Sequence, residues 1–133
     1  MRVSVPATIL ALTLAACAPA PAPDAAQGQQ VWRLSTVDNL PFGAEVSITL
    51  SDKGRHITGQ GPCNGFSADI INDAYPAVRV INVTSTKMAC PKLAEENYFL
   101  EALSKTTGQI AAPELLIFSS TSGHRLEFLP AGG

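Results

Sequence analysis

The chain has 133 residues, of which 46% are apolar and 15% are charged, and its formal net charge at pH 7 is −2. This length suits one domain, and the apolar content excludes a disordered polyelectrolyte. The weak charge argues against nucleic-acid binding, because such proteins need a basic patch to contact phosphates. Three cysteines are too few for a small domain held mainly by disulfides.

The first 16 residues are typical of a secretion signal. A positive start at Met1-Arg2 precedes an apolar stretch over residues 3–14. Twelve helical residues span roughly 18 Å, against a hydrocarbon core of ~30 Å, so the stretch is too short for a transmembrane helix. The segment Leu14-Ala15-Ala16-Cys17 resembles the lipobox of bacterial lipoproteins. That resemblance implies cleavage before Cys17 and acylation of its sulfur and of the new N-terminus; the alternative is an ordinary signal peptide with a chance Cys.

Residues 17–30 are expected to form a tether between the lipid and a folded domain. Pro alternates with Ala in the first half of this segment, which predicts a semi-rigid polyproline-like spacer of ~3 Å per residue. Ala18 follows the Cys, and in the lipoproteins that this chain resembles such a residue favours passage to the outer membrane. We therefore expect a lipid-anchored protein of the bacterial cell envelope, at the periplasmic face of the outer membrane.

Alternating apolar and polar residues predict short β-strands over most of the remaining chain. The clearest run is residues 45–51, where Val46, Ile48 and Leu50 share one face. Asp52-Lys53-Gly54 then predicts a hairpin loop, in which Gly54 can adopt a positive φ. Further strands are predicted at residues 31–35, 55–61, 66–70, 78–83, 114–120 and 124–129.

One helix is predicted between these strands. Pro91 suits a first helical turn, and Gly108 is expected to end the helix. The apolar face that this helix would bury consists of Leu93, Phe99, Leu100 and Leu103.

Glu96 falls inside this apolar face. A buried, unpaired carboxylate costs several kcal/mol, so the side chain must find hydrogen-bond donors. We expect it to be a structural acceptor for backbone N–H groups or for the hydroxyls of Ser85 and Thr86. The alternative is a group that faces a ligand or handles protons.

These elements predict a mainly β (α+β) domain, in which a small antiparallel β-barrel carries one packed helix. Closing the sheet removes its unpaired edges. Trp32, Phe66, Phe99 and Leu103 are expected to fill the interior.

Cys63 and Cys90 are expected to form a disulfide that fixes the start of the helix to the turn around Cys63. The chain-entropy model assigns such a loop ~3.5 kcal/mol of stabilisation. One alternative is a metal site with His56 and His124, although the ligand spacing typical of such sites is missing. The other is a reactive thiol, although no Cys-x-x-Cys motif occurs.

Three ordered segments resemble the META domain family, which includes the heat-shock protein HslJ. They are residues 59–68, 85–91 and 96–103, and the opening Trp32-Arg33-Leu34 also fits. The resemblance implies a compact, lipocalin-like β-barrel with a helix packed against it over residues 31–133, and no assigned catalytic residues. The landmark residues of the motifs are Trp32, Gly59, Asn64, Phe66, Thr86, Met88, Pro91, Glu96 and Leu100.

The sequence favours a binding protein over an enzyme. It contains no motif that joins a nucleophile to a base, no phosphate-binding glycine loop, and no indication of a cofactor or metal. The leading hypothesis is an envelope lipoprotein that supports envelope integrity or stress tolerance by binding another envelope component, with no nucleic-acid partner. A second hypothesis is a carrier of a small apolar ligand in the barrel, and a third is a hydrolase or protease inhibitor that uses the loop at Tyr75-Pro76.

The lipid anchor predicts that Cys17→Ala abolishes membrane attachment. Cells grown with labelled palmitate should label the unaltered protein and not the variant, and the variant should move to the soluble periplasmic fraction, because acyl chains supply the membrane affinity. An unlabelled protein together with a membrane-bound variant would contradict the anchor.

Overall fold

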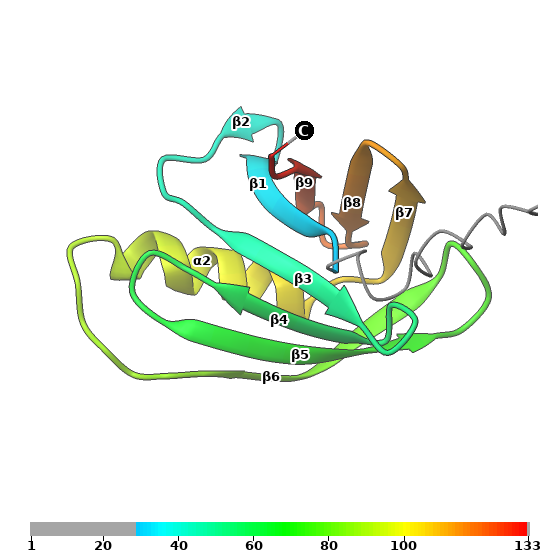
Figure 1. Ribbon diagram of the computed structural model, residues 1–133, viewed down its shortest axis with the longest axis horizontal. Coiled ribbons are helices and arrows are strands. Elements are labelled where there is room, and N and C mark those ends of the chain that lie inside the picture. The colour runs from blue at the N-terminus through cyan, green and yellow to red at the C-terminus, as the bar shows by residue number, and fades with distance from the viewer. Residues whose placement is uncertain (1–28, 133) are drawn as a thin grey trace, which may run out of the picture.

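The computed structural model describes residues 29–132, so the predicted signal peptide and most of the tether lie outside the described residues. The described chain forms one antiparallel sheet with one helix (Figure 1). The strands lie in the order β6-β5-β4-β3-β1-β9-β8-β7, and β2 pairs only with β1. Their bounds are β1 Val31–Val37, β2 Leu40–Pro41, β3 Ser47–Ser51, β4 His56–Gln60, β5 Gly65–Asn72, β6 Val78–Ser85, β7 Gly108–Ala112, β8 Leu115–Ser119 and β9 Arg125–Pro130, and the helix α2 is Leu93–Ser104.

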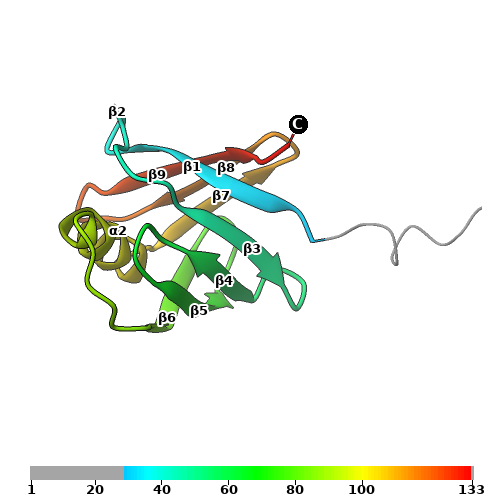
Figure 2. The same ribbon diagram turned by 60° about the vertical axis from the view of Figure 1, so that its left-hand side comes forward.

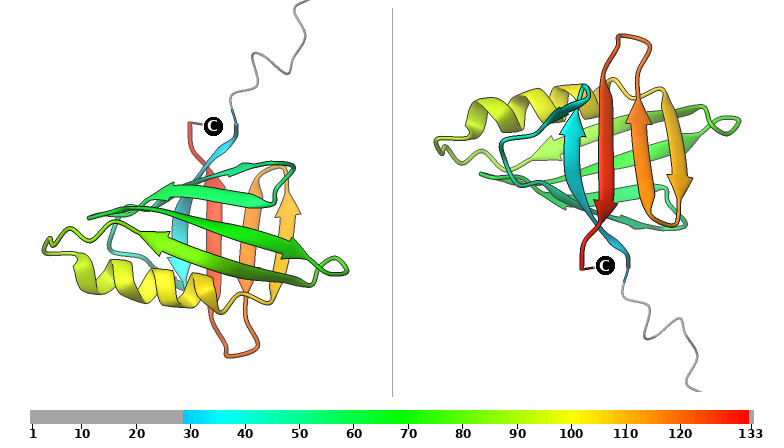
Figure 3. Two further views of the ribbon diagram at one scale, coloured as in Figure 1. Left: turned by 90° about the horizontal axis from the view of Figure 1, so that it is seen from below. Right: turned by 90° about the horizontal axis from the view of Figure 1, so that it is seen from above.

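The sheet curls into a half-barrel, which confirms the predicted fold class. The strands of the β1, β9, β8 and β7 half run across those of the β3 to β6 half (Figure 3). The two ends of the sheet meet at one bridge between Ala77 and Gly108, with a hydrogen bond from the Val78 amide to the Thr107 carbonyl (3.1 Å). Helix α2 lies beside the opening and contacts β6 and β9 (Figure 2). The helix therefore buries apolar side chains of the sheet that would be exposed at the opening of the half-barrel.

Aromatic side chains fill the space between the sheet and the helix. Phe99 of α2 makes edge-to-face contacts with Phe66 (ring centroids 5.4 Å apart) and Phe128 (6.3 Å). Phe128 in turn contacts Phe118 at 5.9 Å. Such pairs are favourable beyond the area that they bury. The four residues expected to fill the interior, Trp32, Phe66, Phe99 and Leu103, are all buried.

The helix is shorter than the sequence predicts. It ends at Ser104, and Gly108 is the first residue of β7 instead of the helix terminus. Pro91 lies two residues before Leu93, outside the helix.

The predicted loop at Asp52-Lys53-Gly54 is confirmed, because all three residues have positive φ angles. None of the described helices has the length and apolar composition needed to cross a bilayer.

Gly59 on β4 leaves no room for a side chain, because a Cβ at this position would overlap the ring of Phe66. We expect Gly59→Ala to destabilise the domain by about 1–3 kcal/mol, the usual cost of overpacking a core. Gly43→Ala is the matched control, since nothing lies within 4 Å of a Cβ there. Urea unfolding followed by tryptophan fluorescence measures both variants. Equal stability of the two would contradict the steric constraint.

Candidate binding groove

The carboxylate of Glu96 connects helix α2 to the turn between β4 and β5. Its side chain is only 1% exposed. Oε2 accepts the backbone N–H groups of Cys63 and Asn64, both at 2.8 Å, and Oε1 accepts the side-chain amide of Asn64 at 2.5 Å. Three donors satisfy a buried charge that would otherwise be costly. The structural role expected for Glu96 is confirmed, but the Thr86 hydroxyl donates to Asn64 instead of to Glu96.

Asn64 extends these contacts to the segment that follows β6. Its Oδ1 accepts the Thr86 hydroxyl at 2.8 Å and the Met88 backbone N–H at 2.6 Å. Its Nδ2 also donates to the Met88 carbonyl at 3.0 Å. Asn64 is 2% exposed, so these bonds form away from water. One buried amide thus fixes residues 86–88 relative to the β4–β5 turn.

The disulfide between Cys63 and Cys90 is present and reinforces the same region. The Cα atoms are 5.6 Å apart and the bond spans 27 residues of chain. The expected disulfide is therefore confirmed, and the two sulfur atoms are used for it. Among the described residues there is no group of three His, Cys, Asp or Glu side chains that could hold a metal ion.

The structure brings most of the landmark residues together. Thr86, Met88 and Glu96 each form a hydrogen bond with Asn64. Gly59 pairs with Phe66 across β4 and β5. Three landmarks belong neither to the Asn64 network nor to the pair of Gly59 and Phe66: Trp32 lies in the core on β1, Pro91 is exposed before the helix, and Leu100 is half-buried on α2. Cys17 lies outside the described residues.

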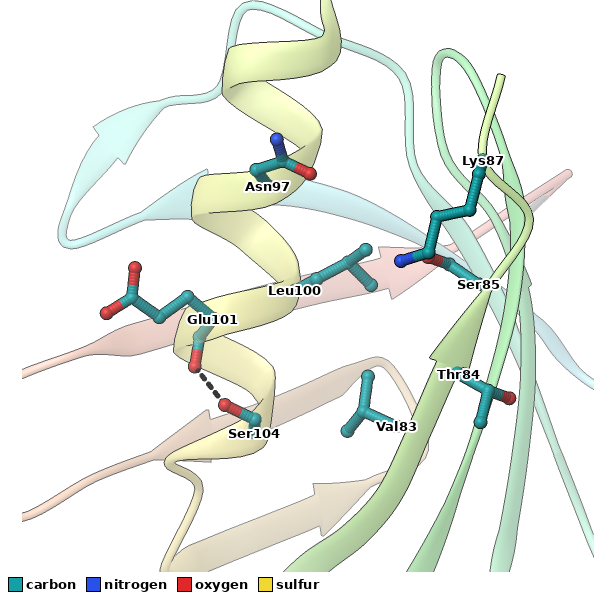
Figure 4. Close-up of a pocket in the computed structure, with 8 residues that line it drawn as sticks. All are labelled: Val83, Thr84, Ser85, Lys87, Asn97, Leu100, Glu101 and Ser104. Atoms are coloured by element: carbon teal, nitrogen blue, oxygen red, sulfur yellow. Dashed lines mark hydrogen bonds between the residues drawn. The ribbon is translucent and has the colours of Figure 1, made fainter. Parts of the chain in front are cut away.

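A groove of about 510 Å³ runs between α2 and β6, beside this network. Figure 4 shows Val83 and Leu100 pointing toward each other across it, with Lys87 extending toward the helix. A second hollow of about 320 Å³ continues the groove toward the start of the helix. The groove is lined by Val83, Thr84, Ser85, Lys87, Asn97, Leu100, Glu101 and Ser104, and the hollow adds Asn64, Thr86, Met88, Ala89 and Leu93.

The two charged residues that line the groove, Lys87 and Glu101, differ in their ion pairing. Glu101 forms an ion pair with Lys105 at 2.7 Å, and this hydrogen bond lowers the pKa of the Glu101 carboxyl. Lys87 is exposed and forms no ion pair within residues 29–132. An apolar floor with amide, hydroxyl and ammonium groups along its walls is suited to holding a ligand through non-covalent contacts. Neither Lys87 nor Asn97 stands out in a local sequence pattern, so only the tertiary structure reveals their place in the groove.

Both histidines lie away from the groove lining. His56 contacts Asp69 at 2.8 Å on the strands β4 and β5, and Asn82 also donates to this carboxylate at 2.9 Å. His124 contacts Asp38 at 3.3 Å, before β9. Both side chains are only partly buried.

A second polar cluster joins the other side of α2 to the sheet. Asp38 accepts the hydroxyl of Tyr98 at 2.5 Å and the backbone N–H of Arg125 at 2.9 Å, and His124 also contacts it. The Tyr98 hydrogen bond is the main reason that the pKa of the Asp38 carboxyl is lowered, with smaller contributions from Arg125 and His124. The rings of Tyr98 and His124 are also in edge-to-face contact at 5.6 Å.

Glu96→Gln tests the buried carboxylate. The amide replaces one acceptor oxygen with a donor, which leaves buried N–H groups facing an NH₂ group. We expect a loss of about 3 kcal/mol in the free energy of unfolding. Glu95→Gln is the matched control and should change stability by less than about 0.5 kcal/mol, because Glu95 is partly exposed and pairs only with Lys92. Similar losses in the two variants would argue against a special role for Glu96.

The Asp38 cluster predicts a pH effect with a defined sign. Because the folded pKa of Asp38 is below its ordinary value of 3.8, its stabilisation is present above that value and is lost as the pH falls through the folded pKa. Tyr98→Phe removes the largest contribution, so the Asp38 pKa should rise in an NMR titration and acid unfolding should begin at a higher pH. Tyr75→Phe, at an exposed loop position, should leave both unchanged. An unchanged Asp38 pKa in Tyr98→Phe would refute this assignment.

The comparisons with known proteins agree with this architecture. A protein from Burkholderia xenovorans, solved by NMR, is similar at 28% identity over 89% of this chain and 94% of that one, with a TM-score of 0.59. A DUF4847 family protein from Bacteroides vulgatus shares the fold at 12% identity, over 76% of this chain and 92% of that one, with a TM-score of 0.58. No curated protein matches the sequence. The META domain model matches residues 24–133, so the chain belongs to the META domain family.

Proposed function

We propose that this protein is a non-enzymatic envelope lipoprotein whose META domain binds another envelope component through the groove between α2 and β6. In this proposal acylated Cys17 anchors it at the periplasmic face of the outer membrane, and its binding supports envelope integrity or stress tolerance. The order of signal, lipobox-like segment and Pro-rich tether supports the anchor. In the same proposal, the protein belongs to the HslJ-like members of the META domain family, which its three motifs resemble.

The observation that supports a binding role most directly is the fixed wall of the groove. Residues 86–88 are held by Asn64, Asn64 is held by Glu96 of the opposite wall, and the disulfide ends at Cys90. A preformed site loses little conformational entropy on binding, so its contacts convert more fully into affinity. Two buried polar side chains, those of Asn64 and Glu96, thus position this surface.

The packing of the interior favours this role over a carrier of an apolar ligand inside the barrel. Phe99, Phe118 and Phe128 are fully buried between the sheet and the helix, and Trp32 packs with the same cluster. These side chains occupy the place that a ligand inside the half-barrel would need.

Photo-crosslinking in intact cells tests the proposed function. A photoreactive amino acid replaces Asn97, which is exposed in the groove, and in a control replaces Ile110, which is 48% exposed on β7. We expect one reproducible adduct with an envelope component from the Asn97 site and none from the Ile110 site. The absence of any adduct at Asn97, or the same adducts at both sites, would count against binding in the groove.

A further inference from the structure

The strand β6 is the last strand of the sheet, and its outer edge lies along the groove. In an antiparallel pair, successive residues direct their backbone N–H and C=O groups alternately toward the neighbouring strand and away from it. The Thr86 amide donates to the Gly65 carbonyl at 3.0 Å, so Thr86 faces β5 and Ser85 faces outward. The outer edge therefore presents the main-chain groups of Ser85 beside the groove.

The same reasoning applies at the other end of β6. Ile70 of β5 donates to the Arg55 carbonyl at 2.8 Å, on the β4 side, so the main-chain groups of its partner Val80 also face outward. Val80 and Ser85 are an odd number of residues apart and both face outward because a bulge interrupts the pairing of β5 with β6 between Ile81 and Thr84. Within residues 29–132, no hydrogen bond joins the outward main-chain groups of Val80 or Ser85 to another residue. At its start, β6 pairs briefly with the chain around β7, because Ala77 bridges Gly108 and the Val78 amide donates to the Thr107 carbonyl. The outer edge of β6 has no strand partner after Val78 among the described residues.

The groove has the length of a short extended peptide. Its helical wall runs from Leu93, in the hollow, to Ser104, which is twelve residues of helix. The eleven steps of ~1.5 Å between them span roughly 16 Å. An extended chain rises ~3.3 Å per residue, so about five residues fit along it. Apolar side chains at alternate positions could contact Leu100 and Val83 on the floor, or the hollow at Met88.

The charge of the groove selects the kind of peptide. Lys87 extends toward the helix and has no ion pair within the described part of the chain, whereas Glu101 is already paired with Lys105 (Figure 4). A carboxylate on the occupant would complement Lys87, and a second cation would be repelled by it.

We propose that the groove binds an extended polypeptide segment of about five residues, which pairs with the outer edge of β6 and places an acidic side chain beside Lys87. This inference rests on the proposed function, because it names the chemistry of the envelope component bound there. The segment adds a strand to an unpaired edge, so main-chain hydrogen bonds supply affinity while Lys87 and the apolar floor supply selectivity.

A random heptapeptide display library, screened on the full-length protein in detergent micelles, tests the proposal. We expect enriched peptides to contain Asp or Glu and to alternate apolar residues. Lys87→Glu should weaken binding of a synthesised enriched peptide about tenfold, whereas Lys53→Glu, at the exposed β3–β4 hairpin, should not. Circular dichroism confirms that both variants are folded.

Two further measurements examine the main-chain pairing itself. Bound peptide should slow hydrogen exchange of the Ser85 amide at least several-fold, and N-methylation of alternate peptide amides should abolish binding in one register and spare it in the other. Enrichment of basic peptides, no enrichment at all, equal effects of the two lysine variants, or unchanged exchange at Ser85 would each overturn the proposal.

The two proposals fail in different ways. An adduct at Asn97 in cells without peptide binding in vitro would leave a groove-bound envelope component in place and refute the extended-peptide occupant. Peptide binding in vitro that fulfils every expectation, without an adduct in cells, would support the peptide chemistry and refute the envelope role.

Discussion

A single buried carboxylate organises one side of this domain. Glu96 would normally be excluded from the apolar face of a helix, because an ionised group loses its hydration there. Here the turn at Cys63 and Asn64 supplies three N–H donors to its two oxygens. The turn can come this close because Gly61 has no side chain, and a Cβ at that position would press against the carboxylate. Charge, turn and helix position therefore depend on one another.

The hydrogen bonds extend beyond the turn, because both the Nδ2 and the Oδ1 atoms of Asn64 take part in them. It donates to Glu96 and to the Met88 carbonyl, and accepts from Thr86 and from the Met88 amide. The disulfide at Cys63 joins the same turn covalently to Cys90. The covalent bond limits how far the two segments can separate, and the hydrogen bonds fix their orientation. A small domain with a limited core benefits from both.

The helix also explains why the sheet remains a half-barrel. Strands β6 and β7 approach each other only near the bridge of Ala77 and Gly108, and the space beyond this bridge is where α2 packs. Phe99 and Leu103 of the helix complete the aromatic core that a fully closed sheet would have to form by itself. This arrangement leaves the outer edge of β6 beside a groove, so the helix that completes the core also forms one wall of that groove.

Local patterns in the sequence predicted seven of the nine described strands, the presence of the helix, the disulfide and the structural role of Glu96. Alternation at residues 45–51 predicts β3 because side chains on a strand alternate between faces, and Glu96 stands out because it interrupts an apolar face. The short strand β2 and the strand β7, with its Gly-Gln-Ile-Ala-Ala sequence, lack such periodicity. Only the tertiary structure decided the strand order, the groove at Lys87, and the meeting of Asp38 with Tyr98 and His124, which lie 60 and 86 residues away. The physical reason is that periodicity reports which face of an element is buried, whereas the partner across that face is chosen by packing between distant segments.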